Sequence, residues 1–297
     1  PVTKNFDKTK ISLKGPGETS YASISASLNG AASEIYYPTT SDGFMYSAFA
    51  DVTNYVKNHG IGEYSVADIA LVEGAASGTG YYGGWSMIVI YENSAMKIRD
   101  ITVLDGHAYV AGGSTLNYDI SISGFNAVQT GNVGIKVGVI AGEGDRDIPG
   151  DYFKIQQKNT TTYVDLNHSG NTSGNFFNSS IQTGGNARTP DLVNNTGLDI
   201  SMFKIPNTNN SIIGNNQTTT NFKYGSTQDT YVIFALAMAV DAYVPEMEGI
   251  LSNTTINGSP VVGAGPFTAQ PGQELGYKVQ IKNKGTESIK NSKIIIP

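Results

Sequence analysis

Residues 230–243 read TYVIFALAMAVDAY, the most apolar stretch of the chain. Its central part, Tyr231–Val240, is about half of the ~20 residues that a helix needs to cross a bilayer, and Asp229 and Asp241 flank it. A short apolar run that is bounded by polar residues and rich in aromatic and β-branched side chains is typical of a buried strand. We therefore predict a β-strand over Thr230–Tyr243 and no membrane insertion of this fragment.

Five more segments show the strand pattern, either alternating apolar and polar residues or clustering β-branched and aromatic ones. They are Trp85–Tyr91, Ile98–Leu104, Leu116–Ser123, Val133–Ile140 and Tyr152–Gln156. The chain also holds 35 Gly and only 15% charged residues, a balance that favours strands and turns over helices. Together these features predict an all-β fold, an antiparallel β-sandwich or jelly roll.

One segment follows a helical period instead. Apolar residues recur at helical spacing between Met45 and Val56, Asp51 is placed to cap a first turn, and Gly60 follows as a stop signal. We predict one short helix over Asp51–Asn58, packed through its apolar stripe across the end of a sheet.

The length of 297 residues exceeds the roughly 100–200 residues of a usual domain, so we expect one large domain and a second element. After residue 248 the sequence changes to short strands joined by tight turns, as at the start of an immunoglobulin-like domain. We expect a β-sandwich domain over residues 1–248 and an incomplete Ig-like β-sandwich over residues 249–297. Pro1 and the final Ile294–Pro297 lead us to expect that both ends are cut from a longer protein.

The net charge of −6 argues against a nucleic-acid partner, because phosphate binding needs clustered Lys and Arg, and the chain has no such cluster. A cation is the easier partner. Cys is absent, so the chain has neither disulfides nor thiol chemistry.

The densest acidic cluster consists of Glu143, Asp145, Asp147 and Asp151, with glycines between them. Carboxylates and backbone carbonyls on such a turn are the oxygen ligands that Ca²⁺ prefers, so these four residues are candidate metal ligands. The spacing is not that of an EF-hand. A solvated turn, in which Arg146 pairs with a carboxylate, is the alternative and stays open.

Two other regions suggest binding surfaces. Residues 159–221 are dense in Asn, Thr, Ser and Gly, which fits either a binding region or an ordered loop over a sheet edge. Trp85, beside Tyr81 and Tyr82, is placed to form a sugar-stacking platform or to enter the core, and the apolar strand predicted after it favours the core.

Several blocks of the sequence resemble a module of large bacterial surface proteins. The blocks include Gly84–Glu92, Gly142–Arg146 and Asn175–Ser179, while Gly276–Thr286 is similar to a conserved Ig-like repeat. In gliding and surface-colonising Bacteroidota such proteins are adhesins exported by the type IX pathway. The resemblance implies an extracellular, cell-surface location and an adhesin-like module of uncharacterised function followed by Ig-like repeats.

We expect an adhesion module that binds a glycan or protein surface without catalysis, and the alternative is a structural subunit of a filament or layer that self-associates by strand pairing. A glycoside hydrolase would need two coupled carboxylates, for which Glu143 and Asp151 are the candidate pair. The single Trp, the polar loop around this pair and the absence of hydrolase, metalloprotease or phosphate-loop motifs argue against an enzyme.

Overall fold

The computed structural model describes residues 7–27, 34–36, 45–72, 81–244, 247–285, 289 and 292–295. The residues Pro1, Thr286, Ile296 and Pro297, on which expectations rested above, lie outside this part. Strands dominate, and one α-helix is present among the described residues, which confirms the predicted all-β class. No helix in the described ranges has the length and apolarity to cross a membrane.

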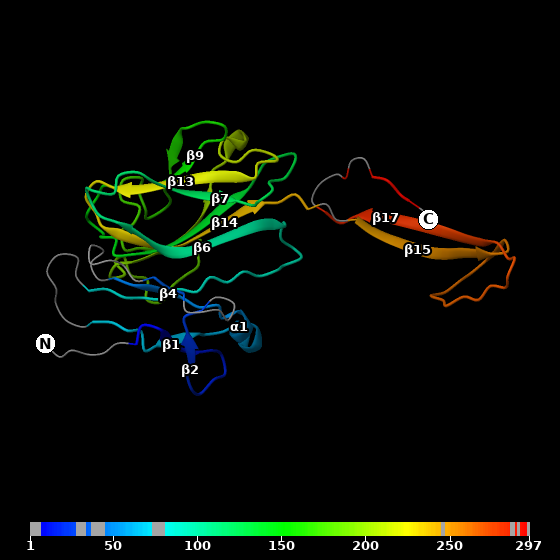
Figure 1. Ribbon diagram of the computed structural model, residues 1–297, viewed down its shortest axis with the longest axis horizontal. Coiled ribbons are helices and arrows are strands. Elements are labelled where there is room, and N and C mark those ends of the chain that lie inside the picture. Colours follow the sequence, from blue (N-terminus) through cyan, green and yellow to red (C-terminus); the bar gives the residue numbers. More distant parts are fainter. Residues whose placement is uncertain are drawn as a thin grey trace.

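Two sheets, antiparallel except for one strand pair, form the body of the molecule and lie one above the other in Figure 1. The five-stranded sheet has the order β11 (Ile181–Gln182), β12 (Leu198–Ile205), β8 (Ile135–Gly142), β14 (Tyr231–Asp241) and β6 (Arg99–Val110). The four-stranded sheet has the order β10 (Tyr163–Asp165), β9 (Asp151–Gln156), β13 (Thr219–Ser226) and β7 (Tyr118–Ser123). The pair β11–β12 is parallel, whereas the other pairs are antiparallel.

The hydrophobic core lies between these two sheets because alternate residues of each strand face inward. Val137 and Val139 of β8 face the core from one sheet, and Phe153 and Phe222 do so from the other. The rings of Phe153 and Phe222 stack at a centroid distance of 5.1 Å. The predictions of strands at Leu116–Ser123, Val133–Ile140 and Tyr152–Gln156 are confirmed by β7, β8 and β9, with ends shifted by up to two residues.

The apolar stretch that opened the sequence analysis forms β14, which pairs with both β6 and β8. The dipeptide Asp105–Gly106 has the composition of a turn but lies inside β6, which runs on from the expected Ile98–Leu104 as far as Val110. The register of β14 against β6 shifts between Ile233 and Ala235, opposite this dipeptide. A β-bulge absorbs the irregularity, so the chain continues in the same strand rather than turning.

The predicted strand Trp85–Tyr91 is also wrong. These residues belong to no strand, and their side chains are partly or largely exposed, with Ile90 at 59% and Tyr91 at 66%. Trp85 is 41% exposed, so the expected core position is wrong as well. Strand propensity describes how side chains fit a pleated surface, but a strand also needs a neighbouring edge, and this segment has no ladder partner among the described residues.

A smaller unit precedes the sandwich and lies below it in Figure 1. It contains the sheet β2 (Ala22–Ser25), β1 (Lys10–Lys14) and β5 (Ser65–Ala67), the pair β3 (Glu34–Tyr36) and β4 (Ser47–Phe49), and helix α1 (Thr53–His59). Asp51 Oδ1 accepts a hydrogen bond from Thr53 N at 2.9 Å, and Gly60 ends the helix with φ 70°. The predicted helix is therefore present and begins two residues later than expected.

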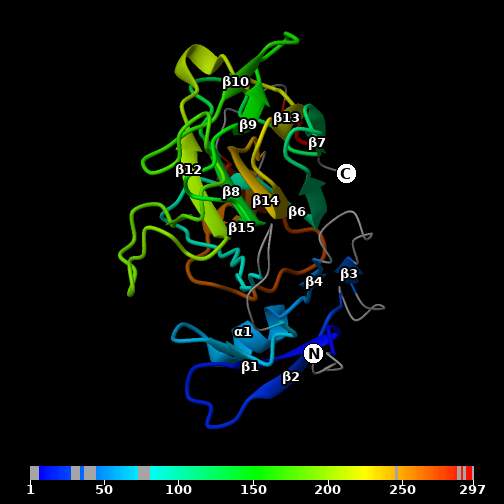
Figure 2. The same ribbon diagram turned by 90° about the vertical axis from the view of Figure 1, so that its left-hand side faces the viewer.

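The last part of the chain forms a sheet of β16 (Ser259–Pro260), β15 (Met247–Ile256) and β17 (Leu275–Asn283). This sheet stands to one side of the sandwich in Figure 1 and lies behind it in Figure 2. Leu251 pairs with Val279 and both are exposed, at 67% and 42%. Strand β15 begins at the expected change of sequence, while the Ig-like character of residues 249–297 stays a prediction.

Candidate ligand-binding site

A hollow of about 190 Å³ opens where β8 leads into the loop before β9. We call it the Glu143 hollow. Its walls come from residues 81–82, residues 143–146, Ser179, Asn194 and residues 196–197. The structure thus brings together the tyrosines beside Trp85, part of the acidic loop and part of the loop-rich region, which the sequence marked separately.

Tyr82 is held in the wall by close packing against Gly142 and by a hydrogen bond. A Cβ atom at Gly142 would come within 2.6 Å of the Tyr82 ring and 2.7 Å of the Phe234 ring, so only glycine leaves room for both. The Tyr82 hydroxyl donates a hydrogen bond to Met45 Sδ at 3.0 Å. Tyr81, the next residue, is 54% exposed and leaves part of its ring accessible to a ligand.

Ser179 stabilises the opposite wall through hydrogen bonds of its hydroxyl group. Its hydroxyl donates to Asn194 Oδ1 at 2.8 Å and accepts from the backbone N–H groups of Asn195 at 3.0 Å and Gly197 at 2.8 Å. Ser179 and Thr196 adopt φ angles of 59° and 52°, a region that non-glycine residues visit rarely. The wall is therefore a fixed loop whose strain the surrounding hydrogen bonds maintain.

Glu143 is the unusual residue of the hollow. It has φ 76° and is 6% exposed, and its backbone N–H donates to Gly197 O at 2.6 Å. Its Oε2 is buried and has no hydrogen-bond partner among the described residues. Burial, and then the nearby Asp229 and Asp145, raise the pKa of Glu143 to about 9, so the side chain is a neutral carboxylic acid near pH 7.

Three more carboxyl groups lie buried close to the hollow, on Asp151, Asp199 and Asp229. Asp151 Oδ1 accepts from the backbone N–H groups of Phe176 at 2.6 Å and Phe177 at 2.8 Å. Burial raises the pKa of Asp151 to about 6, and these amide bonds oppose the rise. In the described part of the chain, none of the four buried acids forms an ion pair with a basic residue.

Asp199 and Asp229 were missed at the level of sequence. Asp199 Oδ1 accepts from Ser180 N at 3.0 Å, and Asp229 Oδ2 accepts from Asp145 N at 3.0 Å. Burial raises the pKa of Asp229 to about 7 and places the pKa of Asp199 well above its ordinary value. The sequence did contain a signal for Asp199, because this residue stands between the apolar Leu198 and Ile200. An acidic residue in an apolar strand is rarely buried without a partner, so it was a candidate site residue.

The four candidate metal ligands divide into two groups. Glu143 and Asp151 turn inward, whereas Asp145 is exposed and the Asp147 side chain is 91% exposed, with Oδ1 at 3.7 Å from Arg146 Nε. The described residues include no group of three or more His, Cys, Asp or Glu that is suited to hold a metal ion. The four therefore do not form one ligand set here, and a Ca²⁺ site in this loop stays a prediction.

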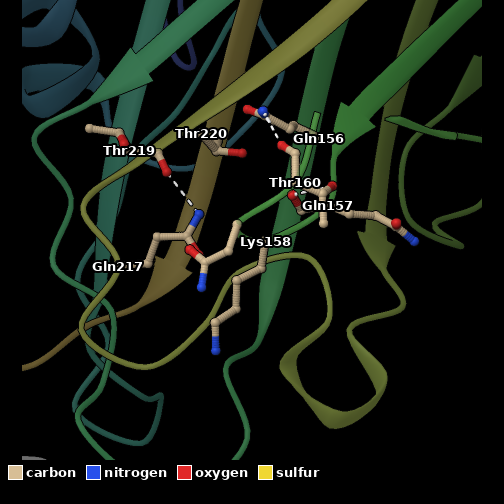
Figure 3. Close-up of a pocket in the computed structure, with 8 residues that line it drawn as sticks. Gln156, Gln157, Lys158, Thr160, Gln217, Thr219 and Thr220 are labelled. Atoms are coloured by element: carbon tan, nitrogen blue, oxygen red, sulfur yellow. Dashed lines mark hydrogen bonds between the residues drawn. The ribbon is translucent and has the colours of Figure 1, made fainter. Parts of the chain in front are cut away.

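A second hollow, of about 230 Å³, lies at the other end of β9 (Figure 3). Amide and hydroxyl side chains line it, including Gln156, Thr160 and Gln217. Gln156 Nε2 donates to Thr160 O at 2.6 Å, and Gln217 Nε2 donates to Thr219 O at 2.8 Å, so part of this lining is already bonded internally. It lacks the aromatic ring and the buried acid of the Glu143 hollow.

Comparisons with known proteins do not assign the chain to a family. No protein-family model and no curated protein matches the chain. Among solved structures, the chain has a likeness to the infectious bursal disease virus VP2 subviral particle, with 9% identity, a TM-score of 0.26 and coverage of 80% of this chain and 68% of that one. A likeness of this size supports no conclusion about fold family or function.

The arrangement is chemically suited to hold a small polar ligand. An accessible aromatic face, a neutral buried acid, a guanidinium group and amide and hydroxyl groups surround one space. These groups supply both donors and acceptors of hydrogen bonds. The space differs from a deep apolar pocket, which would suit a lipid or a drug-like molecule.

Proposed function

We propose that this chain is an extracellular adhesion module, presented at the surface of a bacterial cell, that binds glycan or protein surfaces without changing them. The observation that carries the proposal is the Glu143 hollow, in which residues from three distant segments surround a polar space. A rigid sandwich that displays such loops is a common design for binding proteins. The sequence resemblance to repeat-containing surface proteins supports the same function.

Weak contacts suffice for such a module. A surface protein present in many copies gains avidity because tethered sites bind together without any new contact. The ligand is released unchanged in this proposal, so long incubation with an oligosaccharide leaves its length distribution as it was.

The direct test is binding of the purified chain, coupled to fluorescent beads to supply multivalency, to arrayed glycans and to intact bacterial and animal cells. We expect saturable binding to a restricted set of surfaces and competition by the free chain. If the folded chain binds to none of the glycans and to none of the cells, the proposed adhesive function is wrong.

A second function, a structural subunit of a filament or layer, is favoured by one observation. Residues Trp85–Tyr91 have strand-forming side chains, lie outside every sheet and expose Ile88, Val89 and Ile90 at 39% to 59%. Such a segment is a template for pairing with another chain. Sedimentation velocity over a wide concentration range tests it: growing species that Val89→Lys abolishes would favour assembly, and a constant monomer would exclude it.

We also propose, as a separate element, that Ca²⁺ stabilises the loop of Glu143, Asp145, Asp147 and Asp151. Support comes from the carboxyl oxygens Glu143 Oε2 and Asp151 Oδ2, which lack hydrogen-bond donors in the described part of the chain. Ca²⁺ would have to displace the proton of Glu143 and draw the exposed Asp145 and Asp147 toward the two buried acids. A ligand that binds the native state raises the melting temperature by mass action. Excess Ca²⁺ should therefore raise Tm by several degrees relative to chelator, and the double variant Asp145→Ala, Asp147→Ala should lose this rise. Equal Tm values in Ca²⁺ and chelator would refute the site.

A further inference from the structure

We propose that the Glu143 hollow is the subsite for one neutral sugar residue, whose ring packs on Tyr81 and whose hydroxyl groups bond to Glu143 and Arg146. This inference rests on the proposed adhesive function, because it names the ligand class and the residues that would serve it. It also chooses between glycan and protein as the ligand.

The unmet hydrogen-bonding capacity of Glu143 is the first step. Glu143 lines the hollow and is only 6% exposed, and its buried Oε2 has no partner among the described residues. A buried polar group without a hydrogen-bond partner destabilises the folded state. The backbone of Glu143, with φ 76°, holds the residue in the wall of the hollow, where rotation of the carboxyl group would let Oε2 bond to a ligand hydroxyl.

The mixture of charges in the wall selects a neutral ligand. Arg146, which pairs with Asp147 only at 3.7 Å, retains N–H donors for a ligand and repels ammonium groups. Asp145 is an exposed carboxylate in the same wall and repels anions. A hydroxyl group both donates and accepts a hydrogen bond, so a polyhydroxylated ring satisfies both sides at once.

The aromatic wall and the size of the hollow complete the match. Tyr81 is 54% exposed, whereas Tyr82 is fixed by Gly142 and Met45, so Tyr81 is the ring that offers an open face. Aromatic faces pack against the apolar face of a sugar ring. The volume of about 190 Å³ is below the ~300 Å³ at which pockets for drug-sized ligands begin, which suits a single ring of a longer glycan.

The experiment uses the whole chain and the methyl glycosides of glucose, galactose, mannose and N-acetylglucosamine, observed by saturation-transfer NMR and titrated to a Kd. Methylammonium and methyl glucuronide serve as charged probes. We expect saturable, millimolar binding of at least one neutral glycoside and none of the charged probes. Tyr81→Ala should weaken that binding by between about twofold and about tenfold, the loss expected when one aromatic packing contact is removed.

Matched variants separate the site from general damage. Tyr91→Ala removes a tyrosine that is 66% exposed in the same segment but outside the hollow, and it should leave the Kd unchanged. Arg146→Ala should weaken binding. Glu143→Gln retains a neutral hydrogen-bonding group and should retain most of the affinity, whereas Glu143→Ala should not. Unchanged melting temperatures of Tyr81→Ala and Arg146→Ala establish that these variants fold.

Three outcomes overturn the inference: no saturable neutral glycoside, preferential binding of a charged probe, or a Kd that Tyr81→Ala leaves unchanged. The proposed function has a separate readout. If the beads bind glycans or cells and Tyr81→Ala and Arg146→Ala leave that binding intact, adhesion stands and this subsite is wrong. If the beads bind to no glycan and to no cell, while the titration shows a glycoside in the hollow, the subsite stands and the adhesive function is wrong.

Discussion

Gly144 lies in the wall of the Glu143 hollow, at the point where the loop touches Phe177. A Cβ atom here would overlap the carbonyl oxygen of Phe177 and come within 2.7 Å of Asp199 Oδ2. Because the overlapped atom is backbone, no rotamer change relieves the clash. We predict that Gly144→Ala lowers the free energy of unfolding by about 1–3 kcal/mol, measured by urea denaturation.

The control for this prediction is Gly174→Ala, because a Cβ atom at Gly174 would meet nothing within 4 Å. It should change the free energy of unfolding by no more than about 0.5 kcal/mol. Equal effects of the two substitutions would mean that the loop around Gly144 is loosely packed.

His59 supplies a pH-dependent contact in the N-terminal unit. Its Nδ1 lies 2.7 Å from Tyr55 O and its Nε2 2.8 Å from Glu18 Oε1. These two hydrogen bonds, the one to Tyr55 first, raise the pKa of His59. The stabilisation is therefore complete below the unfolded pKa of about 6.5 and is lost as pH rises through the higher folded pKa.

We predict that the melting temperature of the wild type, relative to that of His59→Gln, falls as pH rises from about 6 to about 8. Thermal unfolding of both proteins across this range is the measurement. Taking the difference removes the contribution of the buried acids, which titrate in both proteins. A difference that is constant or grows with pH would contradict the assigned contacts.

At the scale of elements, the segment Trp85–Tyr91 and strand β14 have similar sequences, and both were predicted as strands, but their structures differ. Both are apolar and β-prone, but β14 pairs on both sides, whereas residues 85–91 belong to no ladder in the described part of the chain. Amide exchange follows local opening and hydrogen bonding. We predict that residues 85–91 exchange several orders of magnitude faster than the centre of β14, measured by hydrogen exchange and mass spectrometry.

Dilution provides the control for this experiment. Protection of residues 85–91 that appears only at high protein concentration would indicate pairing between chains, as the structural-subunit alternative requires. Protection equal to that of β14 at every concentration would show that the segment pairs within the chain and that its unpaired arrangement is wrong.

At the scale of the whole molecule, the sandwich and the sheet of β15–β17 differ in how they are stabilised. The buried apolar side chains among the described residues end with Ala242, whereas Leu251, Val279 and Ile281 remain exposed. Removing the last part of the chain therefore uncovers no identified core. We predict that a chain ending at Val244 keeps the melting temperature of the sandwich to within about 2 °C, measured by calorimetry. A large fall in Tm would show that the two parts stabilise each other.

The local sequence predicted much of the fold. Alternation in β8 and β9, the apolar run of β14 and the glycine after α1 are properties of neighbouring residues, and each predicted its element. The site was predictable only in pieces. Glu143 stood out as an acidic residue and Tyr81 as an aromatic one, but no local pattern related either to the loop at Asn194.

The sequence by itself therefore determined the all-β class and most of the main strands, because periodicity and composition show which side chains are buried. Only the tertiary structure decided that Trp85–Tyr91 stays unpaired and that Asp105–Gly106 continues a strand. It also decided that Glu143 lies near Asp229, and Asp199 near Asp151, as buried carboxyl groups. These outcomes depend on which distant strands become neighbours. Sheet pairing joins residues many positions apart, and no local period encodes that choice.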